Sequence, residues 1–236
     1  MSSSINLSEV EKFSKVASEW WDYDGPLKTL HDINHCRVKY IVDVISNKFS
    51  INNLDILDIG CGGGIVCEPL SRLGANVVGI DASKENIAVA KAHAKEMKLA
   101  ISYLQSTIER FVEKKKTFDC ITCLEVLEHV DSVDEFIKNC CKALNKKGII
   151  FFSTINRNLK SYLTTIMAAE YILKWLPVGT HEWKKFIKPS ELSRFLSREG
   201  AEIKEIKGIE FKPISAKDWV TTDDISVNYI LYAVKR

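Results

Sequence analysis

The sequence lacks a long uninterrupted apolar run and has almost no excess of charge of one sign. Its most apolar stretch, residues 159–176, contains three charged residues and is followed by Pro177, which argues against a membrane-spanning helix. The 33 basic and 31 acidic residues are interspersed and give a formal net charge of +2, so we expect no nucleic-acid partner. Residues 1–13 fit neither a signal peptide nor a transit peptide, and we expect a cytoplasmic protein.

Cysteine is present, but not in the pattern of a disulfide framework. The seven cysteines are odd in number and scattered, mostly within apolar runs, as is typical of reduced thiols in a cytosol-like compartment. Cys120 and Cys123 have the spacing of a zinc or redox pair, but they lie in a predicted strand and no second pair completes a tetrahedral site. We therefore expect neither disulfides nor a cysteine-bound metal.

Short β-rich apolar runs alternate with helical stretches from residue 54 onward. The predicted strands are 54–59, 76–80, 101–104, 118–124, 148–154, 202–211 and 227–234. The predicted helices are 8–21, 32–49, one capped by Ser83, 131–144, 159–176 and one opened by Pro189. This order predicts a Rossmann-like α/β fold with a seven-stranded, mostly parallel sheet, helices on both faces and a last strand that can enter antiparallel, which is the outline of class I methyltransferases.

The length and the 46% hydrophobic content suit one substantial core, so we expect a single domain. Within it we assign residues 1–50 to an N-terminal helical cap and residues 51–155 to a cofactor-binding core. Residues 156–200 form a helical insertion that faces the substrate or a membrane, and residues 201–236 supply the C-terminal strands.

A glycine-rich turn follows the first predicted strand. Gly60, Gly62 and Gly64 lie where an open α/β sheet binds nucleotides, and their missing Cβ atoms permit positive φ angles and close approach of a ligand. Asp81, twenty-one positions after Gly60, closes the next strand, where a carboxylate can accept both ribose hydroxyls. The plain structural alternative is a tight turn without a ligand.

The spacing of the turn favours S-adenosyl-L-methionine over a dinucleotide. A dinucleotide motif that begins at Gly60 would require glycine at position 65, which is Ile65. Asp58 would repel a pyrophosphate, but it suits a ligand that carries an amino group and a sulfonium. A nicotinamide oxidoreductase is therefore disfavoured, while a subunit that binds the cofactor without catalysis stays open as an alternative.

Three polar side chains follow the fourth predicted strand. Glu125, Glu128 and His129 have the spacing i, i+3 and i+4, which would bring them together if the segment turns helically. Two carboxylates and an imidazole suit Mg²⁺ or another divalent cation, which would favour the phenolate form of a bound phenol. The alternative is that these residues shape the floor of the pocket without a metal, and the sequence leaves both interpretations open.

Further motifs extend over nearly the whole chain. They are ASEWWD at 17–22, LHDIN at 30–34, EVLEHV at 125–130, FSTINRN at 152–158, AEYI at 169–172, GTH at 179–181 and KFIKP at 185–189. With these motifs the chain resembles the ubiquinone biosynthesis O-methyltransferase family, although residues 216–226 look individual. The resemblance implies that Arg37, Gly60, Asp81 and Leu124 contact S-adenosylmethionine, and that Glu125, Glu128 and His129 are metal ligands.

The resemblance also implies the acceptors, which are polyprenylated catechols and a demethylated ubiquinol. A general base for the phenol is His129 or His181, since both imidazoles have suitable intrinsic pKa values, and the sequence does not choose between them. Residues 159–176 either dock on the cytoplasmic face of the inner membrane through Tyr162, Trp175, Lys160 and Lys174 or cover the sheet as a core helix. We also expect association with other enzymes of ubiquinone biosynthesis, and the alternative acceptor is another small phenol.

Overall fold

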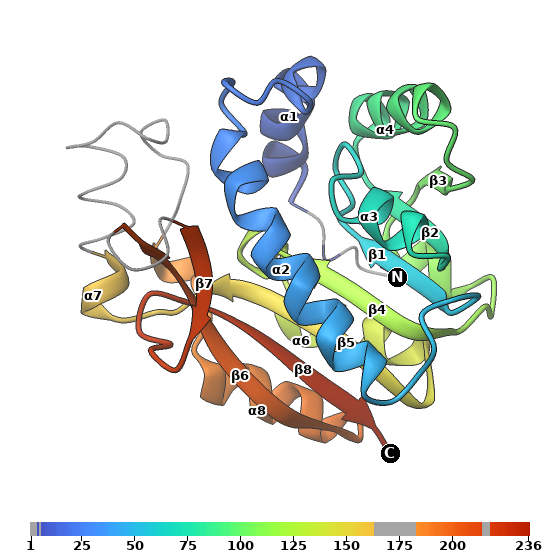
Figure 1. Cartoon of the computed structure of the whole chain (residues 1–236). Helices are drawn as coiled ribbons and strands as arrows, with labels where there is room; N and C mark the ends of the chain where they lie inside the picture. Colours follow the sequence, from blue (N-terminus) through green and yellow to red (C-terminus); the bar gives the residue numbers. More distant parts are fainter. Residues whose placement is uncertain (1–3, 5, 163–182, 214–217) are drawn as a thin grey trace.

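Eight strands form one sheet in the computed structural model, which describes residues 4, 6–162, 183–213 and 218–236 (Figure 1). The strands are β1 (Asp55–Ile59), β2 (Asn76–Asp81), β3 (Ser102–Gln105), β4 (Phe118–Leu124), β5 (Leu144–Ile155), β6 (Ala201–Lys212), β7 (Asp218–Thr222) and β8 (Asn228–Lys235). Their order across the sheet is β3-β2-β1-β4-β5-β8-β6-β7. The first five strands are parallel, and β8 lies antiparallel between β5 and β6.

The predicted α/β architecture and the antiparallel last strand are therefore confirmed, but the predicted count of seven strands is wrong. The eighth strand is β7, which pairs antiparallel with β6 at the edge of the sheet. It lies within residues 216–226, where polar and apolar residues are mixed without a long β-rich run. Its pairing with β6 and its contacts with a helix stabilise it, and a periodicity argument does not detect such partners.

Helices cover both faces of the sheet. They are α1 (Leu7–Lys15), η1 (Ala17–Glu19), α2 (Lys28–Ser46), α3 (Cys67–Arg72), α4 (Lys84–Glu96), α5 (Ile108–Val112), η2 (Leu127–His129), α6 (Val133–Lys142), α7 (Leu159–Ser161), η4 (Trp183–Lys185) and α8 (Pro189–Arg198). The predicted cap of α4 is confirmed, because the Ser83 hydroxyl accepts a hydrogen bond from the Asn86 amide at 3.1 Å. The predicted helix 8–21 is interrupted after Lys15, and most of the predicted helix 159–176 lies outside the described residues.

Two apolar cores separate the helices into layers, because successive side chains of a strand point to opposite faces. Ile56 and its neighbours on one face pack with residues of α2, α3 and α4, such as Ile41. Leu57 and its neighbours on the other face pack with residues of α5, α6 and α8, such as Ile137 and Leu192. Figure 1 shows α2 crossing the front of the sheet, with α6 and α8 behind it.

The cysteines belong to this packing. All seven are buried free thiols, as the sequence predicts. Burial raises the pKa of the Cys120 and Cys123 thiols far above their usual range, so both stay protonated in the core. Among the helices of the described residues, none is both long enough and apolar enough to span a bilayer.

Candidate active site

The carboxyl ends of β1, β2 and β4 meet at one edge of the sheet. The strand order runs outward from β1 in both directions, so the turn after β1 lies at the point where the topology reverses. The glycine turn, Asp81 and Glu125 each follow one of these strand ends. The candidate cofactor residues from the core of the fold therefore gather at this edge, where open α/β sheets bind ligands in a crevice.

The glycine turn has a backbone that side chains would disrupt. Gly60, Gly62 and Gly64 have φ angles of +72°, +52° and +93°, in the left-handed region that favours glycine. A Cβ atom at Gly62 would lie 2.3 Å from the indole of Trp20, and one at Gly63 would lie 2.5 Å from the same ring. The glycines are therefore required both by the conformation of the turn and by the packing of the N-terminal segment on it.

The tryptophan pair of the N-terminal segment holds this segment on the turn. The Trp20 indole N–H donates to Asn86 Oδ1 at 2.9 Å, and the Trp21 indole N–H donates to the carbonyl of Gly63 at 3.1 Å. The Trp21 ring also stacks on His93 with 3.5 Å between centroids. The sequence marks this pair as a distinctive motif but does not show where it binds, since its partners lie at least 42 positions away.

Asp58 lies beneath the turn and is only 3% exposed. Its two oxygens accept hydrogen bonds from the Thr122 hydroxyl at 2.6 Å and the Cys67 thiol at 3.1 Å. Burial raises the pKa of Asp58 to about 6, although both hydrogen bonds oppose the shift. Because Asp58 is buried and both of its oxygens bind protein donors, it supports the turn from below and acts on a ligand through its charge rather than by direct contact.

Asp81 and Leu124 close the neighbouring strands. Asp81 Oδ2 accepts a hydrogen bond from the Gly62 amide at 3.0 Å, and Oδ1 accepts one from the Ser83 amide at 2.8 Å. Burial raises the pKa of Asp81, and these amide donors oppose the shift. Leu124, at the end of β4, is 9% exposed. The Asp81 carboxylate is thus fixed against the turn, at the position expected for a group that binds ribose.

Arg37 reaches this edge from α2 and pairs with Glu125. The Arg37 side chain is buried, and its Nη2 donates to Glu125 Oε1 at 3.0 Å. The Ser153 hydroxyl donates to the same oxygen at 2.7 Å. Burial lowers the pKa of Arg37, and the charge of Glu125 opposes this shift. Glu125 has a φ of +55°, so a residue with a side chain adopts the left-handed conformation where β4 ends.

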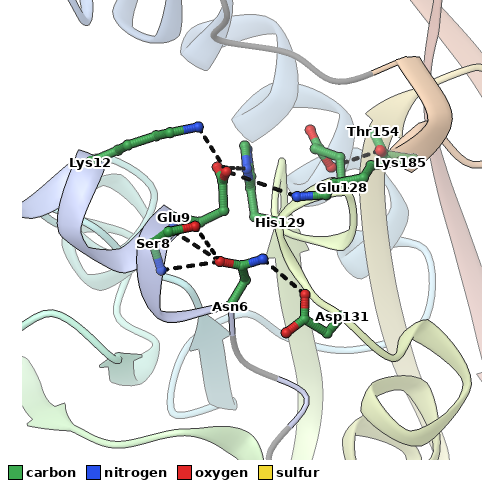
Figure 2. Close-up of polar contacts among 9 residues, drawn as sticks. All are labelled: Asn6, Ser8, Glu9, Lys12, Glu128, His129, Asp131, Thr154 and Lys185. Atoms are coloured by element: carbon green, nitrogen blue, oxygen red, sulfur yellow. Dashed lines mark hydrogen bonds and ion pairs between the residues drawn. The ribbon is translucent and has the colours of Figure 1, made fainter.

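The structure does not bring Glu125, Glu128 and His129 together as a cation site. Glu128 is buried, its pKa is raised by burial, and its Oε2 accepts a hydrogen bond from the Thr154 hydroxyl at 2.7 Å. His129 is directed instead to α1 (Figure 2). No group of three or more His, Cys, Asp or Glu residues in the described part of the chain is arranged to hold a metal ion. In this arrangement the donor set does not fit a shared ion.

Glu9 of α1 is the partner of His129. Glu9 Oε2 lies 2.9 Å from His129 Nδ1, and Glu9 Oε1 lies 2.8 Å from Lys12 Nζ and 4.0 Å from Lys185 Nζ (Figure 2). The His129 hydrogen bond lowers the pKa of Glu9 to about 2. Burial lowers the pKa of His129, but the hydrogen bond to Glu9 and the charge of Glu128 raise it by more, so the net shift is upward. The sequence gives no signal for this contact, because the two residues are 120 positions apart.

The other candidate base, His181, lies outside the described residues. Near it along the chain, a pocket of about 580 Å³ opens between the end of β5 and the start of α8. Asn156, Trp183, Pro189 and Ile225 line it, among others. Because β5 is parallel to β4, this pocket lies at the same edge of the sheet as the glycine turn.

Comparisons with known proteins agree with this architecture. Residues 32–206 match the family described as a methyltransferase domain. The magnesium protoporphyrin IX methyltransferase of Synechocystis, solved with bound S-adenosylhomocysteine, has the same fold at 20% identity, with a TM-score of 0.71 over 98% of this chain and 99% of that one. A plantazolicin methyltransferase superposes with a TM-score of 0.65 at 19% identity over 98% of this chain and 97% of that one.

Two relatives are much closer in sequence. The ubiquinone biosynthesis O-methyltransferase of Pelagibacter ubique is 51% identical over 98% of this chain and 99% of its own length. That of Rickettsia typhi is 46% identical over 99% of this chain and 95% of its own length. Identity of this extent, on a fold whose glycine turn and strand-end acids stand where a methyltransferase requires them, leads to one conclusion: the chain belongs to the ubiquinone biosynthesis O-methyltransferase family.

Proposed function

We propose that this protein transfers the methyl group of S-adenosylmethionine to a phenolic hydroxyl of a polyprenylated catechol and of a demethylated ubiquinol. The observation that carries this proposal is the similarity, over almost the full length of both chains, to relatives named ubiquinone biosynthesis O-methyltransferase. The glycine turn with Asp81 at the carboxyl edge of the sheet supports the choice of cofactor.

In the proposed complex, Asp81 accepts the ribose hydroxyls, and Leu124 contacts the cofactor at the end of β4. The backbone of Gly60 and Gly62 borders the cofactor, and their positive φ angles give the turn the shape that this requires. Arg37 faces the crevice from α2 and binds an anionic group. Asp58 adds negative charge beneath the turn, which favours a cationic ligand.

The cofactor supplies an electrophilic methyl group, and the chain supplies position and a proton acceptor. The phenolic oxygen forms a bond to the methyl carbon while the carbon–sulfur bond breaks, and the phenolic proton passes to a base. His129 is our candidate, since Glu9 holds its Nδ1 and leaves Nε2 as the nitrogen available to a substrate. His181 is the second candidate.

A divalent cation such as Mg²⁺ at Glu125, Glu128 and His129 is a separate proposal. It requires side-chain movement, because Glu125 now pairs with Arg37 and His129 with Glu9. When bound, such an ion would favour the phenolate form of the acceptor.

We further propose that the protein acts at the cytoplasmic face of the inner membrane, where its acceptors reside, in association with other enzymes of ubiquinone biosynthesis. Exposed apolar side chains lie on both sides of the segment 163–182: Leu159 is 72% exposed, Tyr162 37% and Trp183 38%. Lys160 and Lys184 accompany them. Apolar and aromatic groups beside lysines suit an anionic lipid surface. Lys174 and Trp175, expected at the same surface, lie outside the described residues.

The reaction is tested by mass spectrometry of acceptors incubated with the protein and S-adenosylmethionine, with and without exhaustive chelation. We expect a polyprenyl catechol to gain one methyl group per S-adenosylhomocysteine formed. A short phenol methylated equally fast would favour another small phenol as acceptor, and binding of the cofactor without any transfer would contradict the proposal. Full activity after chelation would exclude a shared ion at Glu125, Glu128 and His129, whereas activity restored by Mg²⁺ alone would support it.

The base is tested by substitution of His129 and of its partner. We expect His129→Ala to lower kcat by about 10²- to 10⁴-fold, because general-base catalysis contributes about that much. Glu9→Gln keeps a polar group at His129 but removes its charge, and we expect roughly a tenfold loss of kcat with unchanged cofactor affinity. Glu11→Gln, exposed on the same helix, is the matched control. An unchanged kcat in His129→Ala would contradict His129 as the general base and favour His181.

Asp58 should make cofactor affinity depend on pH. Its raised pKa of about 6 leaves it mostly protonated near about pH 5 and mostly ionised near about pH 7.5. Since the ionised form attracts a sulfonium, we expect the Kd of S-adenosylmethionine to fall roughly five- to tenfold across that range. S-adenosylhomocysteine, which has no sulfonium, should change less in the same titration calorimetry. A difference that persists in Asp58→Asn would assign the effect to another group.

Membrane docking is tested by sedimentation with vesicles of phosphatidylglycerol and phosphatidylethanolamine. We expect the triple substitution of Leu159, Tyr162 and Trp183 by alanine to lower the bound fraction several-fold, because burial of apolar groups in the lipid interface is lost. Tyr23→Ala removes another exposed aromatic residue, 61% exposed, and should not change binding. Equal binding of the triple variant and the wild type would contradict docking through this surface.

A further inference from the structure

One turn of α2 carries two buried polar atoms without hydrogen-bond partners. They are Oδ1 of Asn34, an acceptor, and Nε of Arg37, a donor. The two residues are three positions apart, so their side chains lie on the same face of the helix. A buried polar group without a partner destabilises the protein, so a pair of them with complementary character indicates that a ligand supplies the missing partners.

The orientation of the Asn34 amide is fixed. Its Nδ2 donates to the backbone carbonyl of Ile65 at 2.6 Å, and a carbonyl accepts hydrogen bonds only. The amide oxygen must therefore point away from Ile65, and Oδ1 is an acceptor in its present position. Arg37 is fixed in a similar way, because its Nη2 is held by Glu125, which leaves the Nε–H edge of the guanidinium unused.

These contacts place the two residues beside the cofactor crevice. Ile65 directly follows the glycine turn after β1, and Glu125 directly follows β4. The strands β1 and β4 are hydrogen-bonded neighbours, and the strand order reverses between them. Figure 1 shows α2 crossing in front of the sheet near β4 and β5. One turn of α2 therefore spans the crevice between the ends of the two strands.

The chemistry of the pair matches an amino-acid zwitterion. An α-ammonium group donates hydrogen bonds and an adjacent α-carboxylate accepts them, so one acceptor and one donor on a single helical turn can bind both ends of the same α-carbon. The methionine part of the proposed cofactor has these two groups. Neutral adenosine and a pyrophosphate have no ammonium group for Asn34 Oδ1.

We propose that Asn34 binds the α-ammonium group of the methionine part of the cofactor, while Arg37 binds the α-carboxylate through its Nε–H edge. The inference rests on the proposed function and adds a residue that orients the methyl donor. Asn34 also joins α2 to the turn through Ile65, so the helix and the turn hold the methionine part between them. The position of the sulfonium relative to the acceptor then depends on α2.

The test is a thermodynamic cycle that compares the binding of two ligands to two forms of the protein. The Kd values of S-adenosylhomocysteine and of its deaminated analogue, in which hydrogen replaces the α-ammonium, are measured by titration calorimetry on the wild type and on Asn34→Ala. We expect Asn34→Ala to raise the Kd of S-adenosylhomocysteine roughly ten- to hundredfold, because a hydrogen bond to a charged group is lost. The Kd of the analogue should rise much less. Equal weakening of both ligands would overturn the inference and leave Asn34 only as a support of the turn.

A second variant should increase the preference for S-adenosylhomocysteine over the analogue, whereas Asn34→Ala should reduce it. Asn34→Asp places a carboxylate beside the ammonium, so the preference for S-adenosylhomocysteine over the analogue should rise above that of the wild type, even if the lost bond to Ile65 weakens both ligands. An unchanged preference would also overturn the inference. Asn47→Ala, exposed at the end of α2, is the control. Absence of binding of S-adenosylhomocysteine to the wild type would contradict the proposed function itself, which is a distinguishable outcome.

Discussion

A single buried carboxylate joins the three elements that border the crevice. Asp58, the penultimate residue of β1, accepts hydrogen bonds from Thr122 of β4 and from Cys67 at the start of α3. The parallel register places Asp58 opposite Thr122, so this bond forms only when the two central strands pair correctly. The conformation of the glycine turn depends on that anchor, since the turn connects Asp58 to α3 over a few residues.

The same anchor contributes to an uneven distribution of charge. Asp58, Asp81, Glu125 and Glu128 lie at or near the carboxyl edge of the sheet, where Arg37 pairs with Glu125, while His129 pairs with Glu9 of α1. Burial raises the pKa of Asp58, Asp81 and Glu128, which shows that their ionised forms are poorly solvated there. A cation entering the crevice would relieve this electrostatic strain, whereas a pyrophosphate would increase it.

Local patterns predicted the fold well. Apolar runs located seven strands to within a few residues, and Ser83 marked the start of α4, because strand burial and helix capping are decided by near neighbours. The glycine turn and Asp81 were also predicted to lie close together, since the carboxyl ends of adjacent parallel strands meet at one edge. In contrast, β7 is stabilised by distant partners and was not found.

The fine structure of the site could not be predicted in the same way. The spacing of Glu125, Glu128 and His129 predicts one helical turn, but the backbone of Glu125 adopts the left-handed conformation. Each of the three side chains also binds a partner from another element. The partners of Glu9, Trp20 and Asn34 cannot be read from the sequence, although Trp20 and Asn34 lie in distinctive motifs, because these contacts span 31 to 120 positions. Periodicity has no information on contacts at such separations.

The packing of Trp20 and Trp21 on the glycine turn has a thermodynamic consequence. A ligand that binds to the turn while these indoles are in place stabilises the N-terminal segment. Because the coupling is reciprocal, a change that detaches the segment weakens binding of the ligand by the same free energy. The segment is also joined to His129, because α1 carries Glu9. Binding of the methyl donor and orientation of His129 are therefore linked through one short stretch of chain.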